Sequence, residues 1–244
     1  MNNKYVFILS PPFSGSTLLT SILEIDSNTV SLNNHENNKE GQFIEEVKSE
    51  MRTNAWDNNK IVDWHFVKEI WLKNWDLSKH YLVEKSPPNL CRAQDIQINF
   101  TPSYFLILIR NPYAFVEGKL RRDLRIRGTA DTLEAIKFWI FCARSQMSNV
   151  RELKHTLLIT YEDLCDKTEY SLKSISQFLP KVKLDLNSID LMETLISNKS
   201  GKGEIINLNR KKIKILSTKQ KRIISEELSK DMEVMNFFNY KLIK

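Results

Sequence analysis

Residues 5–23 read YVFILSPPFSGSTLLTSIL. The opening run, Tyr5 to Leu9, is apolar without a break, which is typical of a strand buried on both faces of a sheet. A Pro-Pro turn and the small residues Ser14 to Ser16 follow, and Thr17 to Leu23 then have the pattern of a helix. A strand, a short glycine-containing loop and a helix in this order are typical of α/β folds in which the loop binds phosphate.

Further apolar segments along the chain predict more strands, and helical patterns separate them. The other expected strands are Tyr81–Glu84, Ser103–Ile109 and Thr156–Thr160, and helices are expected at about 113–127, at 131–153 and towards the C-terminus. This alternation predicts a parallel sheet with helices on both faces. A helical insertion is expected at about residues 43–79, and the Asn-rich segment 27–38 is expected to be a loop. We therefore predict one α/β domain over residues 1–244.

Composition narrows the class of protein. The 244 residues have a net charge of +6 and are 41% hydrophobic, as in a globular protein without membrane spans. Basic side chains concentrate in residues 119–127 and 199–222, which is compatible with a polyanionic ligand, an anionic surface or nucleic acid. Cys91, Cys142 and Cys165 are widely spaced, which predicts reduced, mostly buried thiols and neither a disulfide framework nor a zinc site. The first apolar run is too short for a secretory signal, so we expect a cytoplasmic protein.

The loop from Pro12 to Thr17 has two interpretations on its residues alone. A phosphate would receive hydrogen bonds from backbone N–H groups, from the helix N-terminus and from the hydroxyls of Ser14, Ser16 and Thr17, and Gly15 would permit its close approach. A turn before an N-capped helix would use the same residue types. No lysine follows Gly15, although the loop of a nucleoside triphosphatase has one there, so a kinase or ATPase is disfavoured.

Residues 12–18, PFSGSTL, resemble the loop that binds the 5′-phosphosulfate in sulfotransferases dependent on 3′-phosphoadenosine-5′-phosphosulfate (PAPS). In that family the proline is followed by Lys or Arg, and Phe13 stands at this position here. The resemblance is to bacterial-type enzymes whose motif order is similar to that of the cytosolic and tyrosylprotein sulfotransferases. It implies their P-loop-like fold, donor binding by Pro12 to Thr17, and transfer of a sulfuryl group to a hydroxyl or amine. The product would be 3′-phosphoadenosine-5′-phosphate (PAP), and no metal would be required.

Arg110 follows the most apolar predicted strand, where an arginine is either a phosphate ligand or half of an ordinary surface ion pair. Residues 110–118, RNPYAFVEG, resemble the 3′-phosphate motif of the same family, which has a serine eight residues after the arginine. Gly118 occupies that position, and its backbone N–H is the group left to serve there. Arg122 lies one helical turn further on, at an offset where the tyrosylprotein sulfotransferases have an arginine.

Two shorter segments resemble later parts of the family. Residues 160–164, TYEDL, are similar to the segment that closes a strand, which implies that Tyr161 lies near the adenosine; a core tyrosine is the alternative. Residues 199–203, KSGKG, are similar to the basic segment that covers the nucleotide, and a solvated basic loop explains them equally well.

Sulfuryl transfer requires a base for the acceptor and positive charge near the transferring group. Residues 84–89, EKSPPN, resemble the family segment in which a lysine reaches that group, so Lys85 is the expected lysine and the expected substitute for the charge missing at Phe13; a surface lysine before a turn is the alternative. Glu40 is our first choice as the base and His35 the second, since both fall where the related enzymes have an acid or a histidine. Glu36 is also in this segment.

A PAP- or polyanion-binding protein without turnover remains the alternative, because Phe13 and Gly118 both depart from the family pattern. Nucleic-acid binding is less favoured, since no recognition module accompanies the basic stretches. We expect a small-molecule, glycan or peptide acceptor and no membrane or nucleic-acid partner. The expected insertion has four tryptophans, which either line an acceptor pocket or, more commonly, pack a helical cap: Trp56, Trp64, Trp71 and Trp75.

Overall fold

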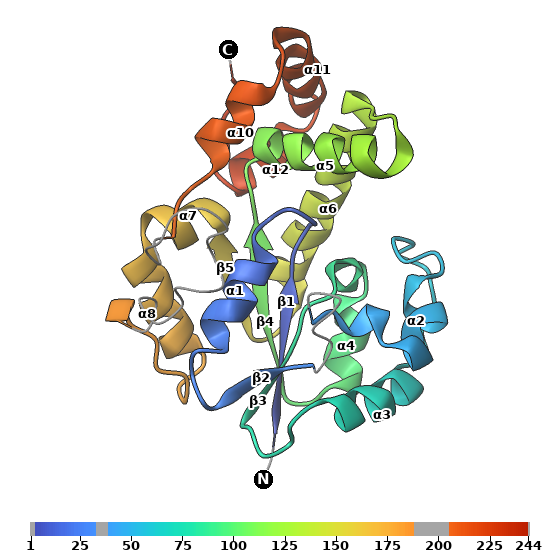
Figure 1. Cartoon of the computed structure of the whole chain (residues 1–244), viewed down its shortest axis with the longest axis vertical. Coiled ribbons are helices and arrows are strands. Elements are labelled where there is room, and N and C mark those ends of the chain that lie inside the picture. Colours follow the sequence, from blue (N-terminus) through green and yellow to red (C-terminus); the bar gives the residue numbers. More distant parts are fainter. Residues whose placement is uncertain (1–2, 33–38, 188–204, 244) are drawn as a thin grey trace.

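A parallel sheet in the order β2-β3-β1-β4-β5 forms the centre of the computed structural model, which describes residues 3–32, 39–187 and 205–243 (Figure 1). Its strands are β1 (Lys4–Leu9), β2 (Thr29–Ser31), β3 (Tyr81–Glu84), β4 (Ser103–Ile109) and β5 (Thr156–Thr160). All adjacent pairs are parallel, and the register places Val6 between Val83 and Tyr104. The predicted α/β fold with a parallel sheet is therefore confirmed.

Helices connect the strands and extend beyond the last one. They are α1 (Ser16–Leu23), α2 (Glu45–Arg52), α3 (Trp64–Asn74), α4 (Ala93–Asn99), α5 (Pro112–Arg127), α6 (Thr132–Glu152), α7 (Tyr161–Asp166), α8 (Thr168–Phe178), α10 (Asn209–Ile215), α11 (Thr218–Leu228) and α12 (Met232–Phe237), with the 3-10 turns η2 (Gly41–Phe43) and η3 (Pro87–Cys91). Local sequence sets the starts of the two longest. Asn111 caps α5 by accepting from the Tyr113 and Ala114 amides, and Asp131 caps α6 through the Glu134 amide.

Alternate side chains of β1 pack into two different cores. Tyr5, Phe7 and Leu9 belong to a core that includes residues of α3, α4 and α6, whereas Val6 and Ile8 pack with residues of α1 and α8 on the other face. This explains why the strand is apolar at every position, since both of its faces are covered by helices (Figure 1).

The prediction of a loop throughout the Asn-rich segment 27–38 was wrong. Thr29 to Ser31 form β2, which pairs in parallel with β3 at the edge of the sheet. The Thr29 hydroxyl donates to the Leu23 and Asp26 carbonyls and so fixes the turn into the strand. Backbone pairing with a distant strand overrode a local composition typical of a loop.

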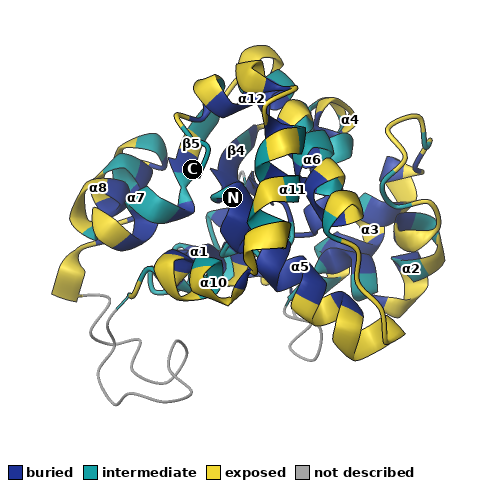
Figure 2. Ribbon diagram, turned by 90° about the horizontal axis from the view of Figure 1, so that it is seen from above, coloured by how far each residue is buried: buried dark blue, intermediate teal, exposed yellow. Residues whose placement is uncertain are grey.

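The order of the strands places the loop after β1 at a crevice. From β1 the chain passes to β2 and β3 on one side of the sheet, and then returns to form β4 and β5 on the other. In such sheets ligands bind beyond the carboxyl ends of the strands where the connections diverge. Helices α5 and α10 lie over this edge (Figure 1). Seen from above, α5 is buried in its first half and exposed from Arg121 onwards, apart from Asp123 (Figure 2).

Two further properties bear on the sequence-based expectations. Cys142 and Cys165 are buried and Cys91 is half-buried, as predicted for structural thiols. Within the described residues, none of the helices is both long enough and apolar enough to cross a bilayer.

Candidate functional site

The loop between β1 and α1 turns through two residues with left-handed backbone angles, Phe13 (φ 63°) and Gly15 (φ 92°). Gly15 is the N-cap of α1, and no side chain caps this helix. The amides of the first helical turn therefore lack the side-chain acceptor that Ser, Thr, Asn or Asp would supply at the N-cap. An uncapped helix N-terminus at the end of a buried strand is suited to bind an anion.

Gly15 is required at its position for space as well as for its backbone angle. A Cβ atom there would lie 2.7 Å from Cδ2 of Tyr161, the first residue of α7. Two hydrogen bonds fix the position of the Tyr161 ring, because its hydroxyl donates to the Ile206 carbonyl and accepts from the Leu208 amide. The loop and the tyrosine predicted to lie near the adenosine are thus in direct contact.

Arg110 lies at the end of β4 and is 5% exposed. Its guanidinium stacks 3.8 Å from the centroid of the Tyr161 ring, and its Nη1 donates to the Phe13 carbonyl at 2.9 Å. Its Nε donates to Asn209 of α10 at 2.7 Å. Nη2 is buried and has no hydrogen-bond partner among the described residues. Burial lowers the pKa of Arg110, but an arginine remains charged at neutral pH, so this N–H group is an unused donor beside the loop.

Phe13 and Gly118, the two departures from the sulfotransferase pattern, are in contact with each other. A Cβ atom at Gly118, in the buried half of α5, would lie 3.1 Å from both Cβ and Cγ of Phe13. The Phe13 ring also packs edge-on against Phe115, and the Arg122 guanidinium carbon lies 6.0 Å from its centroid. The absence of a side chain at Gly118 therefore makes room for the large side chain of Phe13. The Phe13 ring in turn lies beneath the guanidinium of Arg122.

The contact between Phe13 and Gly118 predicts a non-additive effect on stability. Gly118→Ser should lower the free energy of unfolding by about 1 kcal/mol, because the new Cβ crowds Phe13. In a Phe13→Gly background the same substitution should be neutral or stabilising by up to about 0.5 kcal/mol, since serine is the better helix former. Urea unfolding of the four proteins of this cycle measures the coupling, and additive effects of the two substitutions would contradict the packing account.

Glu84, at the end of β3, is 1% exposed and receives four hydrogen bonds. The donors are the Gly41 amide at 3.0 Å, the Ser86 amide at 3.1 Å, the Ser86 hydroxyl and the Asn89 side chain. The Ser86 hydroxyl also accepts from the Gln42 amide at 3.0 Å. This network fixes the turn that follows Glu40 to the carboxyl end of β3.

The turn brings Glu40 and Lys85 together, although they are 45 residues apart. Lys85 Nζ lies 3.1 Å from Glu40 Oε1, and Gln42 Nε2 donates to Glu40 Oε2 at 2.5 Å. The Lys85 side chain is 1% exposed, whereas the Glu40 side chain with which it pairs is 13% exposed. The other candidate bases, His35 and Glu36, lie outside the described residues, as does the basic segment 199–203.

The buried Glu84 carboxyl predicts a specific dependence of stability on pH. Burial raises its pKa from 4.5 to about 7, and hydrogen bonds from Ser86 and from the Gly41 amide oppose this rise. The native state then holds a proton that the unfolded state has lost, so its stabilising contribution is complete below about pH 4.5 and is lost as the pH rises through about 7. The wild type should lose up to about 3 kcal/mol relative to Glu84→Gln over this range.

Urea unfolding of the wild type and Glu84→Gln at about pH 5 and about pH 8 tests this sign. An advantage of the wild type that grows with pH would mean that the four donors lower the pKa of Glu84 below its ordinary value, which would contradict the expectation.

A cavity of about 600 Å³ lies between the β1–α1 loop and the turn that follows Glu40, and its lining does not include Arg110, Gly118, Tyr161 or Lys85. The β1–α1 loop lines it through Pro12, Phe13, Gly15, Ser16 and Thr17. Glu40, Gln42 and Arg122 add polar groups, whereas Phe43, Ala55, Trp56, Pro87 and Pro88 add apolar surface and Arg52 a further charge. Of the tryptophans in the expected insertion only Trp56 lines this cavity, and the other three are in the core, as the packing interpretation predicted.

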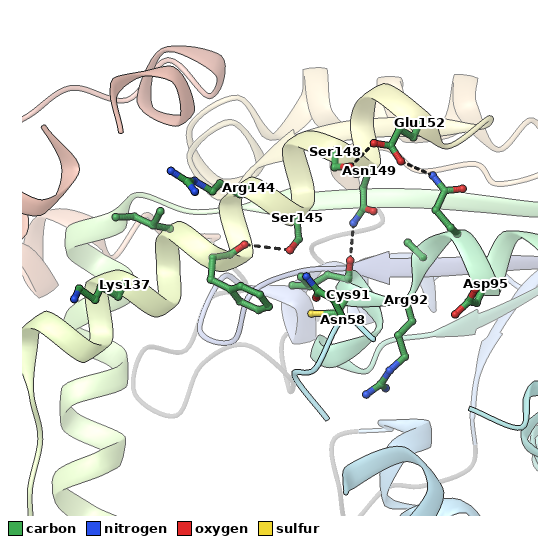
Figure 3. A pocket seen from close by; sticks show the side chains of 15 residues that line it. Asn58, Cys91, Arg92, Asp95, Lys137, Arg144, Ser145, Ser148, Asn149 and Glu152 are labelled. Atoms are coloured by element: carbon green, nitrogen blue, oxygen red, sulfur yellow. Dashed lines mark hydrogen bonds between the residues drawn. The ribbon is translucent and has the colours of Figure 1, made fainter. Parts of the chain in front are cut away.

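A second cavity of about 660 Å³ lies between η3, α4 and α6 (Figure 3). None of the predicted site residues lines it. Some polar groups along it are used in internal contacts, since Asn149 donates to the Leu90 carbonyl and Glu152 accepts from Gln94 and Ser148 (Figure 3). Arg92 also lines it, and its Nε and Nη1 have no hydrogen-bond partner among the described residues. In the part of the chain that the structure describes, no group of three or more His, Cys, Asp or Glu could hold a metal ion. The cavity beside the β1–α1 loop is therefore the candidate active site.

Comparison with solved structures finds proteins with a similar fold. The sulfotransferase domain from the curacin biosynthetic pathway superposes with a TM-score of 0.63 at 18% identity, covering 99% of both chains. The sulfotransferase domain of the Synechococcus PCC 7002 olefin synthase gives 0.62 at 19% identity, covering 99% of this chain and 96% of that one. Mouse sulfotransferase SULT7A1 complexed with PAP gives 0.56 at 15% identity, over 96% and 84% of the two chains.

No protein-family model and no curated protein sequence matches the chain. The fold is that of the sulfotransferases, as the resemblance of the two nucleotide motifs implied.

Proposed function

We propose that this protein is a sulfotransferase that moves the sulfuryl group of PAPS to a hydroxyl or amine of an acceptor and releases PAP. One observation supports the proposal most strongly: the uncapped N-terminus of α1 and the Glu40 carboxylate line the same cavity. Lys85 Nζ lies 3.1 Å from Glu40 Oε1. Anion-binding amides beside a carboxylate are what transfer of a charged group to an acceptor hydroxyl requires.

The described residues fit a nucleotide phosphorylated at both ends. The loop from Pro12 to Thr17 would hold the 5′-phosphosulfate on its amides and hydroxyls, as the uncapped helix allows. Arg110 would direct its unpaired Nη2 at the 3′-phosphate, with the backbone of Gly118 nearby, and Tyr161 would lie beside the adenosine.

Arg122 takes the role of the basic residue missing from the loop. It lines the cavity with Thr17 and Glu40, and its guanidinium lies over the Phe13 ring. A charge positioned in this way can stabilise the oxygens of the transferring group from helix α5 instead of from the loop. This assignment moves Arg122 from the 3′-phosphate, where the motif placed it, to the sulfuryl end.

Glu40 acts as the base in the transfer. It takes the proton of the acceptor hydroxyl while the acceptor oxygen bonds to sulfur, and the bond from sulfur to the 5′-phosphate oxygen breaks so that PAP leaves with the electron pair. Gln42 and Lys85 hold the carboxylate from two sides. Lys85 is thus primarily a positioning residue. Its side chain is buried and does not line the cavity, so its charge acts on the reaction through Glu40.

Incubation of the protein with radiolabelled PAPS and a panel of phenols, alcohols and amines tests the proposal. We expect label to pass to at least one acceptor and PAP to form in equal amount. Binding of PAP without transfer to any acceptor would instead support a nucleotide-binding protein without turnover, and no binding of PAP would contradict the proposal altogether.

A further inference from the structure

We propose that the acceptor carries a negatively charged group, such as a carboxylate, and that Arg52 binds this group in the cavity. The inference rests on the proposed function and names the class of its acceptor. Arg52 is the last residue of α2 and lines the same cavity as the β1–α1 loop and Glu40.

Arg52 is positioned by an aromatic ring of the cavity wall. Its guanidinium carbon lies 4.5 Å from the centroid of the Phe43 ring, and Phe43 also lines the cavity. Stacking on an aromatic face restrains an arginine while leaving its in-plane N–H groups available to a planar anion. The guanidinium is therefore restrained at the cavity wall although the side chain is exposed.

The usual roles of a basic residue at a helix C-terminus are performed by other groups. Lys60 Nζ donates to the Glu50 and Thr53 carbonyls, two of the carbonyls at the C-terminal end of α2. The nearby Glu50 carboxylate accepts from the Asp63 amide. No ion pair involves Arg52 in the described part of the chain. Neither helix capping nor an internal salt bridge accounts for this arginine.

The charge of the cavity wall also favours an anionic acceptor. Its charged side chains are Glu40, Arg52 and Arg122, and Glu40 is neutralised by Lys85. Arg122 lies over Phe13 and so belongs with the donor loop. Arg52 comes from α2, which contributes nothing to that loop, and is left for the acceptor.

The rest of the wall defines the body of the acceptor. Phe43, Trp56, Pro87 and Pro88 are apolar or aromatic and favour a flat or hydrocarbon framework between the reacting hydroxyl and the charged group.

A matched pair of acceptors tests the inference: 2-naphthol, which is neutral, and 6-hydroxy-2-naphthoate, which adds one carboxylate to the same ring system. We expect the wild type to favour 6-hydroxy-2-naphthoate in kcat/KM by roughly twofold to fivefold, the effect of one exposed charge pair. The preference should fall to about one in Arg52→Gln and reverse in Arg52→Glu. Arg125→Gln is the control, because Arg125 is an exposed arginine that does not line the cavity.

A wild type without preference, or a preference that survives in Arg52→Gln, would overturn the inference. Binding of both naphthols to the PAP-loaded protein gives a readout independent of turnover. If neither is sulfated but the carboxylate binds more tightly in an Arg52-dependent way, the inference stands while the proposed transfer fails. Equal binding of the two to the wild type would refute the inference, whatever the enzyme does with PAPS.

Discussion

Glu40→Gln should reduce sulfuryl transfer by about a thousandfold or more, while PAP should bind within about twofold of the wild type. The size of the effect is that of removing a general base, which contributes about a hundredfold to ten-thousandfold in rate. Affinity for PAP should be preserved because Glu40 is the N-cap of the 3-10 turn η2, whereas the donor contacts we assign come from the β1–α1 loop, Arg110 at the end of β4, α5 and α7. Single-turnover transfer from PAPS and calorimetry with PAP measure the two quantities separately.

Glu45→Gln is the matched control for this variant. Glu45 is five residues further along the chain, its side chain is 82% exposed, and its salt bridge is with Lys48 on the same helix. It should transfer sulfate at the wild-type rate. Full turnover in Glu40→Gln would remove Glu40 as the base and would direct attention to His35, the second candidate.

Gly15→Ala should weaken PAP binding by roughly tenfold to a hundredfold. Two costs combine, because the residue has a φ of 92° and its new Cβ would lie 2.7 Å from the Tyr161 ring. Relief requires either the loop or Tyr161 to move, and both belong to the proposed nucleotide site. Calorimetric titration of the variant with PAP measures the loss.

Gly128→Ala is the control, because it introduces the backbone strain of a positive φ without a steric clash. Gly128 also has a positive φ, 72°, at the C-terminus of α5, but a Cβ there would meet nothing within 4 Å. This variant should lose about 1 kcal/mol of stability and keep the PAP affinity of the wild type. Equal PAP affinity in the two variants would mean that contact between the loop and Tyr161 does not shape the site.

Local sequence predicted the central strands because their environment is uniform. Tyr81–Glu84 and Ser103–Ile109 have the predicted bounds, since apolar residues continue for as long as both faces of the strand are covered. Strand β2 was missed because its three residues depend on backbone pairing with β3, in which each partner is 52 residues further along the chain. For the tryptophans of α3, Trp64 and Trp71, packing was the more common of two interpretations, and both are in the core.

The sequence predicted that the site residues follow the ends of strands, but it did not predict the contacts among them. The motifs indicated that the loop, Arg110 and Lys85 would lie at one edge of the sheet, where the structure places them. The salt bridge of Lys85 with Glu40 depends on the network around Glu84, a residue that the sequence marked only as a neighbour of Lys85. No local signal pointed to Asn209, which holds Arg110 from a helix 99 residues away.

The packing of Phe13 on Gly118 changes how the departures from the family pattern are interpreted. Taken singly, each suggested a weakened nucleotide site. In the structure they are complementary, and Arg122 lies over Phe13 where it can supply positive charge. The pattern of one sequence could not show this, because the two positions are neighbours only after α5 folds over the loop.

Calorimetric titration with PAP, and in parallel with adenosine 5′-diphosphate, tests the central claim most directly. The two ligands share the adenosine and a 5′-phosphate, and only PAP has the 3′-phosphate that we assign to Arg110. We predict saturable binding of PAP with a Kd of about 10 µM or below and binding of adenosine 5′-diphosphate that is at least about tenfold weaker. Absence of PAP binding, or equal affinity for the two nucleotides, would contradict the account.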